Sequence, residues 1–485
     1  MSKQSERIIK NSVISTGGYT AGAALNFLII ILVARYLGRE DFGYYSFILS
    51  FVAIFQLFSD LGTRNLLIRD VAVDHSNLSY RFGLSKTIAW ALSGVAFLCI
   101  VAFINLANVP EKVVSSTYIA GIATLVTFHS VLYGAICRAF EKTAIDVAGF
   151  VLHKMVFLSI IVSAFKYNIG FSGIFFIMLI SNTFQLIYYS GVVRYKYGKP
   201  KLVPDVSAAW GLFKESVPLG IAEVVRKIMW QVGTVLLTLL STATATGIFS
   251  ASYKIVQALQ LFSVALAIPF FPAISRLGNN PDKLTTALER TFKFMSIFTL
   301  PLATVIFIFA DPIIRLFYGG KFDEATTVLY ILSITILFIF PNALFPFVFT
   351  SLNRQRVYSI CPLISLCTAI VLNLVLIPLY GYNGAAVSTL IGEIILFCTG
   401  MYLLKKEKLD VRIARYIWKP LVASMGVGGY LFYFRNSPPL NLSIYLISGG
   451  LFYIFMLYIL RILTQDEVKL LINGLKIKML SPTVK

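Results

Sequence analysis

The chain has 485 residues, of which 58% are hydrophobic and only 13% are charged, and its mean hydropathy is +0.80. This composition excludes an ordinary soluble globular protein, in which about a quarter of the residues are charged. The formal net charge of +20 does not indicate a nucleic-acid partner, because the positive residues lie in short segments between apolar runs, as in cytoplasmic loops that face anionic lipid.

Apolar runs long enough to cross a bilayer recur from one end of the chain to the other. Their length favours α-helical spans over the short alternating strands of a membrane β-barrel. The polar start leads into the first run without a small-residue cleavage pattern, which predicts a retained helix and not a signal peptide. The sequence therefore predicts an all-α polytopic membrane protein with fourteen spans, near residues 12–36, 43–62, 84–107, 115–137, 145–166, 172–193, 211–240, 247–272, 292–310, 325–350, 357–378, 384–404, 416–434 and 442–461.

The distribution of positive charge predicts the orientation. If the N-terminus is cytoplasmic, most of the 42 Lys and Arg residues fall on the inner side and few on the outer side. Such a bias is the positive-inside signal. It favours an even number of spans, both termini in the cytoplasm, and a location in the cytoplasmic (inner) membrane.

The chain contains an internal repeat. Shifting it by 204 residues places Gly43 on Gly247, Ser46 on Ser250, and the tripeptide at 56–58 on the same tripeptide at 260–262. Six predicted helices separate the copies, so both have the same orientation and are related by an axis along the membrane normal. We therefore expect two six-helix lobes around a central cavity, residues 1–205 and 206–410, followed at 411–485 by two more helices and a cytoplasmic tail.

The predicted span from Lys214 to Leu240 is unusual because it carries four charged residues on about one third of its circumference. They are Glu215, Glu223, Arg226 and Lys227. A charge near the bilayer centre costs roughly 2.5–3.5 kcal/mol on insertion scales, so this stripe must face protein or water. We interpret it as the wall of a polar cavity. The alternative is a set of buried ion pairs, Glu223 with Arg226 or Lys227.

Several short motifs resemble the polysaccharide-biosynthesis flippase family, which includes the Wzx-type O-antigen and related lipid-linked oligosaccharide transporters. Their order agrees with that family over nearly the whole chain. The motifs are Lys10-Asn11-Ser12, Ala34-Arg35-Tyr36-Leu37-Gly38, Asp41-Phe42-Gly43 with Tyr45, Asp60-Leu61-Gly62 followed by Ile68-Arg69, Ala310-Asp311-Pro312-Ile313-Ile314 with Phe317-Tyr318-Gly319 and Phe322, and Leu379-Tyr380-Gly381-Tyr382-Asn383-Gly384-Ala385-Ala386.

The resemblance implies the multidrug/oligosaccharidyl-lipid/polysaccharide exporter fold, with a V-shaped pair of lobes. It also implies alternating-access transport of undecaprenyl-diphosphate-linked glycans from the inner to the outer leaflet, coupled to an ion gradient or the membrane potential. The expected partners are that glycolipid and membrane lipid, with contacts to a polymerase or glycosyltransferases of the same pathway. We expect a monomer, no nucleic acid and no cofactor beyond a coupling ion, H⁺ or Na⁺.

A diphosphate headgroup needs cations inside the cavity, because they compensate for the water that it loses. Lys154 and Lys254 lie several turns inside their spans, too deep to reach the membrane surface easily. Lys254 shares a helix face with Gln257, and Lys154 shares one with Asp146. We assign the substrate-binding role to Arg226, Lys227, Lys254 and Lys154; the alternative for each is a buried salt bridge.

Four acidic residues also lie at depth: Glu223, Asp146, Asp60 and Glu393. A buried carboxyl group can carry a coupling proton or help to hold sodium. Glu223 has two cations beside it, which keep it ionised, whereas Glu393 has no local partner and is the better proton carrier. The alternative for Glu393 is a hydrogen-bonded structural acid.

Three arginines lie at predicted helix ends: Arg35, Arg64 and Arg69. They either guide substrate at the cavity mouths or anchor the protein to lipid phosphates, and the sequence favours anchoring.

Two other functions compete with the flippase. A multidrug antiporter of the same superfamily would favour an acidic cavity, whereas the deep charges here are at least as cationic as acidic. A membrane polysaccharide polymerase would need a sizeable outer loop with Arg or His, and none is predicted. The sequence also has no catalytic triad, P-loop, HExxH or cysteine spacing for a metal. We therefore predict no catalytic residues, no metal site and no enzymatic activity.

Overall fold

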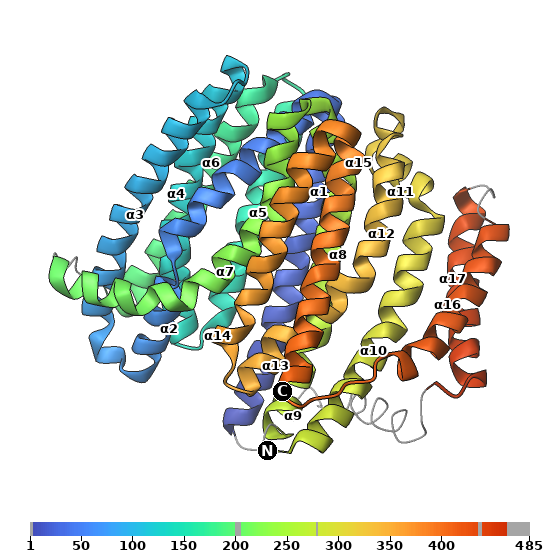
Figure 1. The fold of residues 1–485 in the computed structure, drawn as a ribbon. Helices are drawn as coiled ribbons and strands as arrows, with labels where there is room; N and C mark the ends of the chain where they lie inside the picture. Colours follow the sequence, from blue (N-terminus) through green and yellow to red (C-terminus); the bar gives the residue numbers. More distant parts are fainter. Residues whose placement is uncertain (1–2, 199–204, 278–279, 435–438, 463–485) are drawn as a thin grey trace, which may run out of the picture.

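The computed structural model describes the chain except residues 1–2, 199–204, 278–279, 435–438 and 463–485, and it leaves out the side chains of 3–13, 218–223 and 439–443. The described residues form helices and no strands, as predicted (Figure 1). The helices are α1 (Lys3–Asp60), α2 (Thr63–Val73), η1 (His75–Asn77), α3 (Leu78–Leu106), α4 (Glu111–Ala139), α5 (Thr143–Phe165), α6 (Gly170–Tyr197), α7 (Val206–Leu240), α8 (Ala243–Ala267), η2 (Ile268–Phe270), α9 (Phe271–Leu277), α10 (Pro281–Ile308), α11 (Ala310–Tyr318), η3 (Gly320–Phe322), α12 (Ala325–Asn342), α13 (Phe345–Ser351), α14 (Gln355–Tyr358), α15 (Ile360–Lys406), α16 (Ala414–Tyr433) and α17 (Pro439–Ile459).

The two longest helices are each broken at a glycine. α1 has 58 residues and breaks at Gly38, where φ is 75°, and α15 has 47 residues and breaks at Gly381, where φ is 53°. Glycine adopts these left-handed conformations without the steric penalty of a side chain. Each break falls between two predicted spans. Among the described residues, nine helices are long and apolar enough to cross a membrane, α1 and α15 included; the total of fourteen spans stays a prediction.

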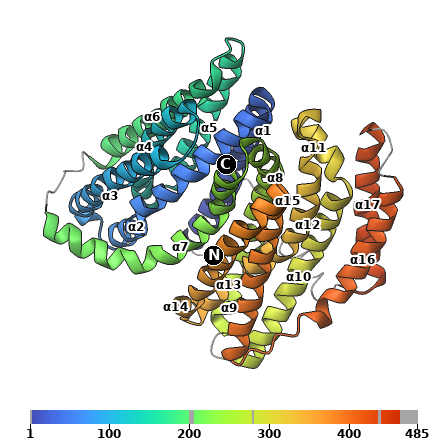
Figure 2. The ribbon, with the colours of Figure 1, turned by 45° about the horizontal axis from the view of Figure 1, so that its top comes forward.

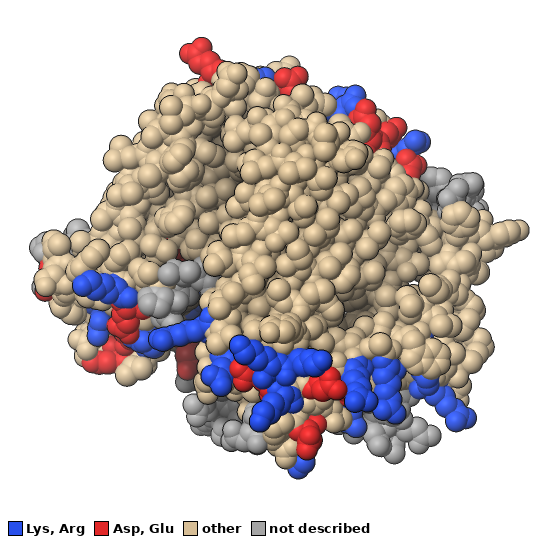
Figure 3. Space-filling view, viewed as in Figure 1, with Lys and Arg blue, Asp and Glu red and all other residues tan. Residues whose placement is uncertain are grey.

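Charged side chains are confined to two opposite edges of the face in Figure 3. Lys and Arg, with fewer Asp and Glu among them, gather along the lower part, which we call the basic edge; residues of both signs also lie along the upper part, the opposite edge. A broad band without charge separates them, as expected of a surface in contact with lipid. α1 starts at the basic edge and reaches the opposite edge at its break (Figure 1).

The predicted repeat has a structural counterpart. A side chain added at Gly43 would overlap the backbone carbonyl of Ala243, and one added at Gly247 would overlap that of Arg39. The contact is therefore reciprocal: the start of the second helix of one repeat packs against the start of the second helix of the other repeat. A pseudo-two-fold axis between these helices explains the reciprocity.

Figures 1 and 2 place α2–α6 on one side of the molecule and α8–α15 on the other, with α16 and α17 beyond α10. α7 starts beside α2 and α3 and curves along the basic edge before it enters the second group (Figure 2). Its first turns pack Ala209 and Leu212 against Leu66, Leu84 and Ile88. The exact lobe boundaries stay predictions.

Candidate functional site

The curvature of α7 separates the charged residues that the sequence places on one stripe. Glu215 lies near the start of the helix, is 51% exposed, and forms a 2.8 Å ion pair with Arg69 of α2. Glu215 therefore belongs to the basic edge, contrary to the expectation that it lines the cavity, because α7 runs along that edge before it turns inward (Figure 1). The Glu223 side chain, a predicted coupling acid, lies outside the described residues.

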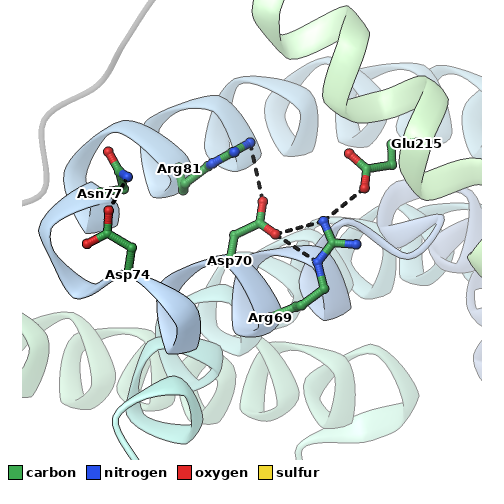
Figure 4. Close-up of polar contacts among 6 residues, drawn as sticks. All are labelled: Arg69, Asp70, Asp74, Asn77, Arg81 and Glu215. Carbon is green, nitrogen blue, oxygen red and sulfur yellow. Dashed lines mark hydrogen bonds and ion pairs between the residues drawn. The ribbon is translucent and has the colours of Figure 1, made fainter.

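Arg69 is held by two carboxylates in a cluster that joins α2 and α3 to α7 (Figure 4). Its guanidinium contacts Asp70 and Glu215, both at 2.8 Å, while Arg81 reaches Asp70 at 3.2 Å. Hydrogen bonds to Glu215 and Asp70 raise the pKa of Arg69. Because both partners are protein groups, Arg69 fastens α7 to the first group of helices.

Arg226 lies further along α7 and is half-buried. Its guanidinium lies 5.9 Å from the centre of the Trp230 ring, within range of a cation–π contact. It is also close enough to Glu393 and Tyr358 to interact with them electrostatically. Lys227 follows it, also half-buried. The part of α7 that lies within the second group of helices thus places the Arg226 guanidinium near α15.

Lys154 and Lys254 are half-buried, and each binds a neutral amide. Lys154 Nζ donates to Oδ1 of Asn26 over 2.9 Å, and Lys254 Nζ donates to Oε1 of Gln257 over 3.0 Å. Among the described side chains, no carboxylate forms an ion pair with either lysine, so the salt-bridge alternative is not seen there. An ammonium without a counter-ion inside a membrane protein is costly unless water or an anion reaches it.

The described contacts do not join Lys154, Arg226 and Lys254 to one another. Each has its own partner, on α1, within α7 and within α8 respectively. The convergence of these three cations and Lys227 on one cavity therefore stays a prediction.

Asp146 is buried and does not pair with Lys154. It accepts hydrogen bonds from the hydroxyls of Tyr19 and Tyr189, the latter at 3.2 Å, and lies 3.7 Å from Nε of Arg138. Asp146 lies in the first turn of α5, about 12 Å along the helix from Lys154, which explains why the two do not meet. The sequence reasoning missed these three partners because they come from α1, α4 and α6.

Asp60 and Arg64 form an ion pair across the junction between α1 and α2, with 3.6 Å between Arg64 Nε and Asp60 Oδ2. Asp60 Oδ1 also accepts from the Arg64 backbone N–H over 3.2 Å. Both predicted residues thus stabilise the turn at Gly62, whose φ is 88°.

Arg35 lies at the opposite edge and connects α1 to α11. Its guanidinium donates to the backbone carbonyls of Leu316 and Phe317 in α11, over 2.5 and 2.7 Å. The neighbouring Arg39 forms an ion pair with Glu324. Arg35 therefore has protein partners that the sequence did not indicate.

Glu393 is buried in α15, where Nδ2 of Asn342 donates to its Oε2 over 2.6 Å. It borders a cavity of about 20 Å³, also lined by Asn373 and Thr389 of α15, Trp230 of α7 and Tyr253 of α8. Such a space holds about one water molecule. The sequence did not identify Asn342 or Asn373.

The cavity also contains an unsatisfied acceptor, because Oδ1 of Asn373 is buried without a hydrogen-bond donor. Oxygen ligands of this kind suit a proton on the carboxyl group or a small hard cation. Among the described residues, no group of three His, Cys, Asp or Glu side chains is placed to hold a metal ion.

The sequence analysis did not single out one further cation, Lys86. Lys86 falls near the start of the predicted span 84–107 and lies inside α3, which starts eight residues earlier, at Leu78; its side chain is half-buried. Its ammonium donates to the Tyr133 hydroxyl over 3.2 Å and lies 5.4 Å from the centre of that ring.

Comparison with known proteins relates this chain to glycan export. A family model described as "Polysaccharide biosynthesis protein" matches residues 8–278, and one described as "Lipid II flippase MurJ" matches residues 159–437. "Capsular polysaccharide biosynthesis protein CapF" of Staphylococcus aureus is 22% identical over 388 residues, which cover 79% of this chain and 96% of that protein.

Two solved structures have a similar fold. One of "Lipid II flippase MurJ, inward closed conformation" aligns with a TM-score of 0.75 at 15% identity, over 93% of this chain and 98% of that one. An inward-facing multidrug resistance MATE family transporter of the MOP superfamily aligns with a TM-score of 0.65 at 13% identity, over 80% of this chain and 94% of that one. The predicted family resemblance is confirmed. Because the first model covers more than half of the residues, the chain belongs to the polysaccharide biosynthesis protein family.

Proposed function

We propose that the protein is a flippase that carries a polyprenyl-diphosphate-linked oligosaccharide across the cytoplasmic membrane by alternating access. Family membership supports a glycan substrate. The observation that carries the proposal at the level of residues is that Lys154 and Lys254 are half-buried cations bound to neutral amides. Such cations can bind a diphosphate, since charge-assisted hydrogen bonds to phosphate are among the strongest in proteins.

The partners of the acidic residues also argue against a multidrug antiporter, although that class shares the fold. A cavity for cationic drugs needs uncompensated carboxylates, yet Asp146 and Asp60 are paired with arginines. Glu393 is the acid that lacks an ion pair among the described candidates, and it lies near Arg226. We therefore expect cells that lack this protein to accumulate lipid-linked glycan in the inner leaflet without becoming sensitive to cationic dyes. The reverse pattern would reject the flippase.

In the orientation that the positive-inside signal predicts, the basic edge is cytoplasmic and the opposite edge faces outward. The outer edge is then closed by contacts of α1 with the second group of helices: Arg39 with Glu324, Arg35 with the α11 carbonyls, and Gly43 against the start of α8. Release of substrate to the outer leaflet requires these contacts to open. The flippase cycle thus alternates between this closed outer edge and an open one.

A charge swap tests the Arg39–Glu324 contact. Both side chains are about half exposed, so we expect Arg39→Glu or Glu324→Arg alone to change the flipping rate by only about two- to fivefold. The double swap should restore the wild-type rate, because it rebuilds the ion pair with reversed polarity. Flipping rates of the variants in vesicles measure this effect. If the double variant shows the summed defects of the two single variants, the Arg39–Glu324 contact does not have the proposed role.

Glu393 is the proposed coupling acid, with H⁺ or Na⁺ as the ion. Glu393→Gln keeps an acceptor for Asn342 and removes the charge, so flipping should continue but lose its response to an imposed H⁺ or Na⁺ gradient. The matched control is Glu407→Gln, which removes the acid that pairs with Arg354 at the basic edge. If flipping by the Glu393→Gln protein responds to both gradients as wild-type flipping does, Glu393 is not the coupling acid.

A further inference from the structure

A second cavity lies at the basic edge, away from the residues assigned to transport. It encloses about 640 Å³ between α9 and α10, which is within the usual range for sites that bind small molecules. Phe270, Ile274 and Leu277 form its apolar wall, and Lys283 and Arg290 of α10 lie on the other side. The groove therefore combines an apolar surface with two positive charges.

Lys283 and Arg290 are seven residues apart, so they lie on the same face of α10. Both are exposed, and neither forms an ion pair with a described residue. Two arginines of this edge, in contrast, have carboxylate partners: Arg354 lies 3.2 Å from Glu407, and Arg412 lies 3.3 Å from Asp410. Lys283 and Arg290 are therefore available to a partner from outside the chain.

The acidic residues nearby do not cancel this charge. Asp282 also lines the groove, which leaves two cations to one carboxylate. Glu289 faces elsewhere, since its Oε1 accepts from the backbone N–H of Arg412 over 2.9 Å. The groove has a net positive rim beside an apolar wall, and its occupant should have an anionic end and an apolar body.

We propose that this groove binds an anionic phospholipid from the leaflet at the basic edge. The phosphate lies between Lys283 and Arg290, and an acyl chain lies along Phe270, Ile274 and Leu277. Basic pockets between membrane helices on the cytoplasmic side are suited to such headgroups. A soluble anion would use the cations but leave the apolar wall uncovered, which makes a lipid the better match.

Native mass spectrometry of the purified chain with phosphatidylglycerol or phosphatidylcholine tests the site. We expect one tightly bound phosphatidylglycerol and much weaker phosphatidylcholine. Lys283→Gln with Arg290→Gln should lower phosphatidylglycerol binding by at least about tenfold, because each substitution removes a charge-assisted hydrogen bond to the phosphate. Ala273→Trp, at an exposed position of the α9 wall, should block the groove and lower binding similarly.

The matched control is Lys405→Gln with Lys406→Gln, which removes the same charge from exposed positions of the same edge outside the groove. It should leave binding unchanged. Equal losses in both pairs would overturn the site, because they would indicate diffuse surface charge. Unchanged binding in the Ala273→Trp protein would also overturn it. Displacement of phosphatidylglycerol by equimolar polyprenyl phosphate would assign the groove to the transported lipid instead. Thermal unfolding of each variant verifies that it is folded.

Discussion

Replacing Lys254 or Arg226 by alanine is expected to remove most of the glycan from the cell surface while the amount of protein stays normal. Each substitution deletes a cation that binds the diphosphate, and a charge-assisted hydrogen bond contributes about 1.5–3 kcal/mol. Transport should therefore fall roughly 10- to 100-fold. Labelling of surface glycan with a lectin, beside a blot for the protein, gives both quantities.

Lys405→Ala is the matched control, because it removes an exposed cation of the basic edge. It should leave glycan display unchanged. If the double variant of Lys254 and Arg226 displays as much glycan as wild type, these two residues do not form the site.

Gly43→Val is expected to disrupt the contact between α1 and α8. Any side chain at this position overlaps the carbonyl of Ala243, and backbone cannot move aside as a flexible side chain can. Overpacking of this kind typically costs about 1–3 kcal/mol. The protein should therefore lose thermal stability, and flipping should fall because the outer edge no longer closes. Gly247→Val should behave in the same way, since the contact is reciprocal.

Gly94→Val provides the control for this experiment. Gly94 also lies in a predicted span, on α3, and a side chain there meets nothing within 4 Å. Its Tm and flipping rate should equal those of wild type. A Gly43→Val protein with the same Tm and rate as Gly94→Val would show that the outer contact is not needed.

The fold could be predicted because its signals are local or repeat along the chain. Apolar runs mark the spans, and Gly38 and Gly381 fall where the prediction requires a reversal. The repeat matched Gly43 with Gly247 as equivalent positions; their contact with each other was found only in the structure.

The partners of the site residues could not be predicted, because they come from distant parts of the chain. Asn26 lies 128 residues from Lys154, and Asn342 lies 51 residues from Glu393. Periodicity along one helix reveals which residues share a face but not what that face meets. For the same reason, the helical wheel assigned Glu215 to the cavity, since it treats α7 as straight.

The most direct test is the flipping of a fluorescent polyprenyl-diphosphate-linked sugar by the purified protein in vesicles. Wild-type protein should accelerate its translocation, and the protein with Lys254→Ala and Arg226→Ala should not, while a cationic dye should remain untransported by both. Wild-type protein that moves the dye and leaves the glycolipid in place would contradict the account.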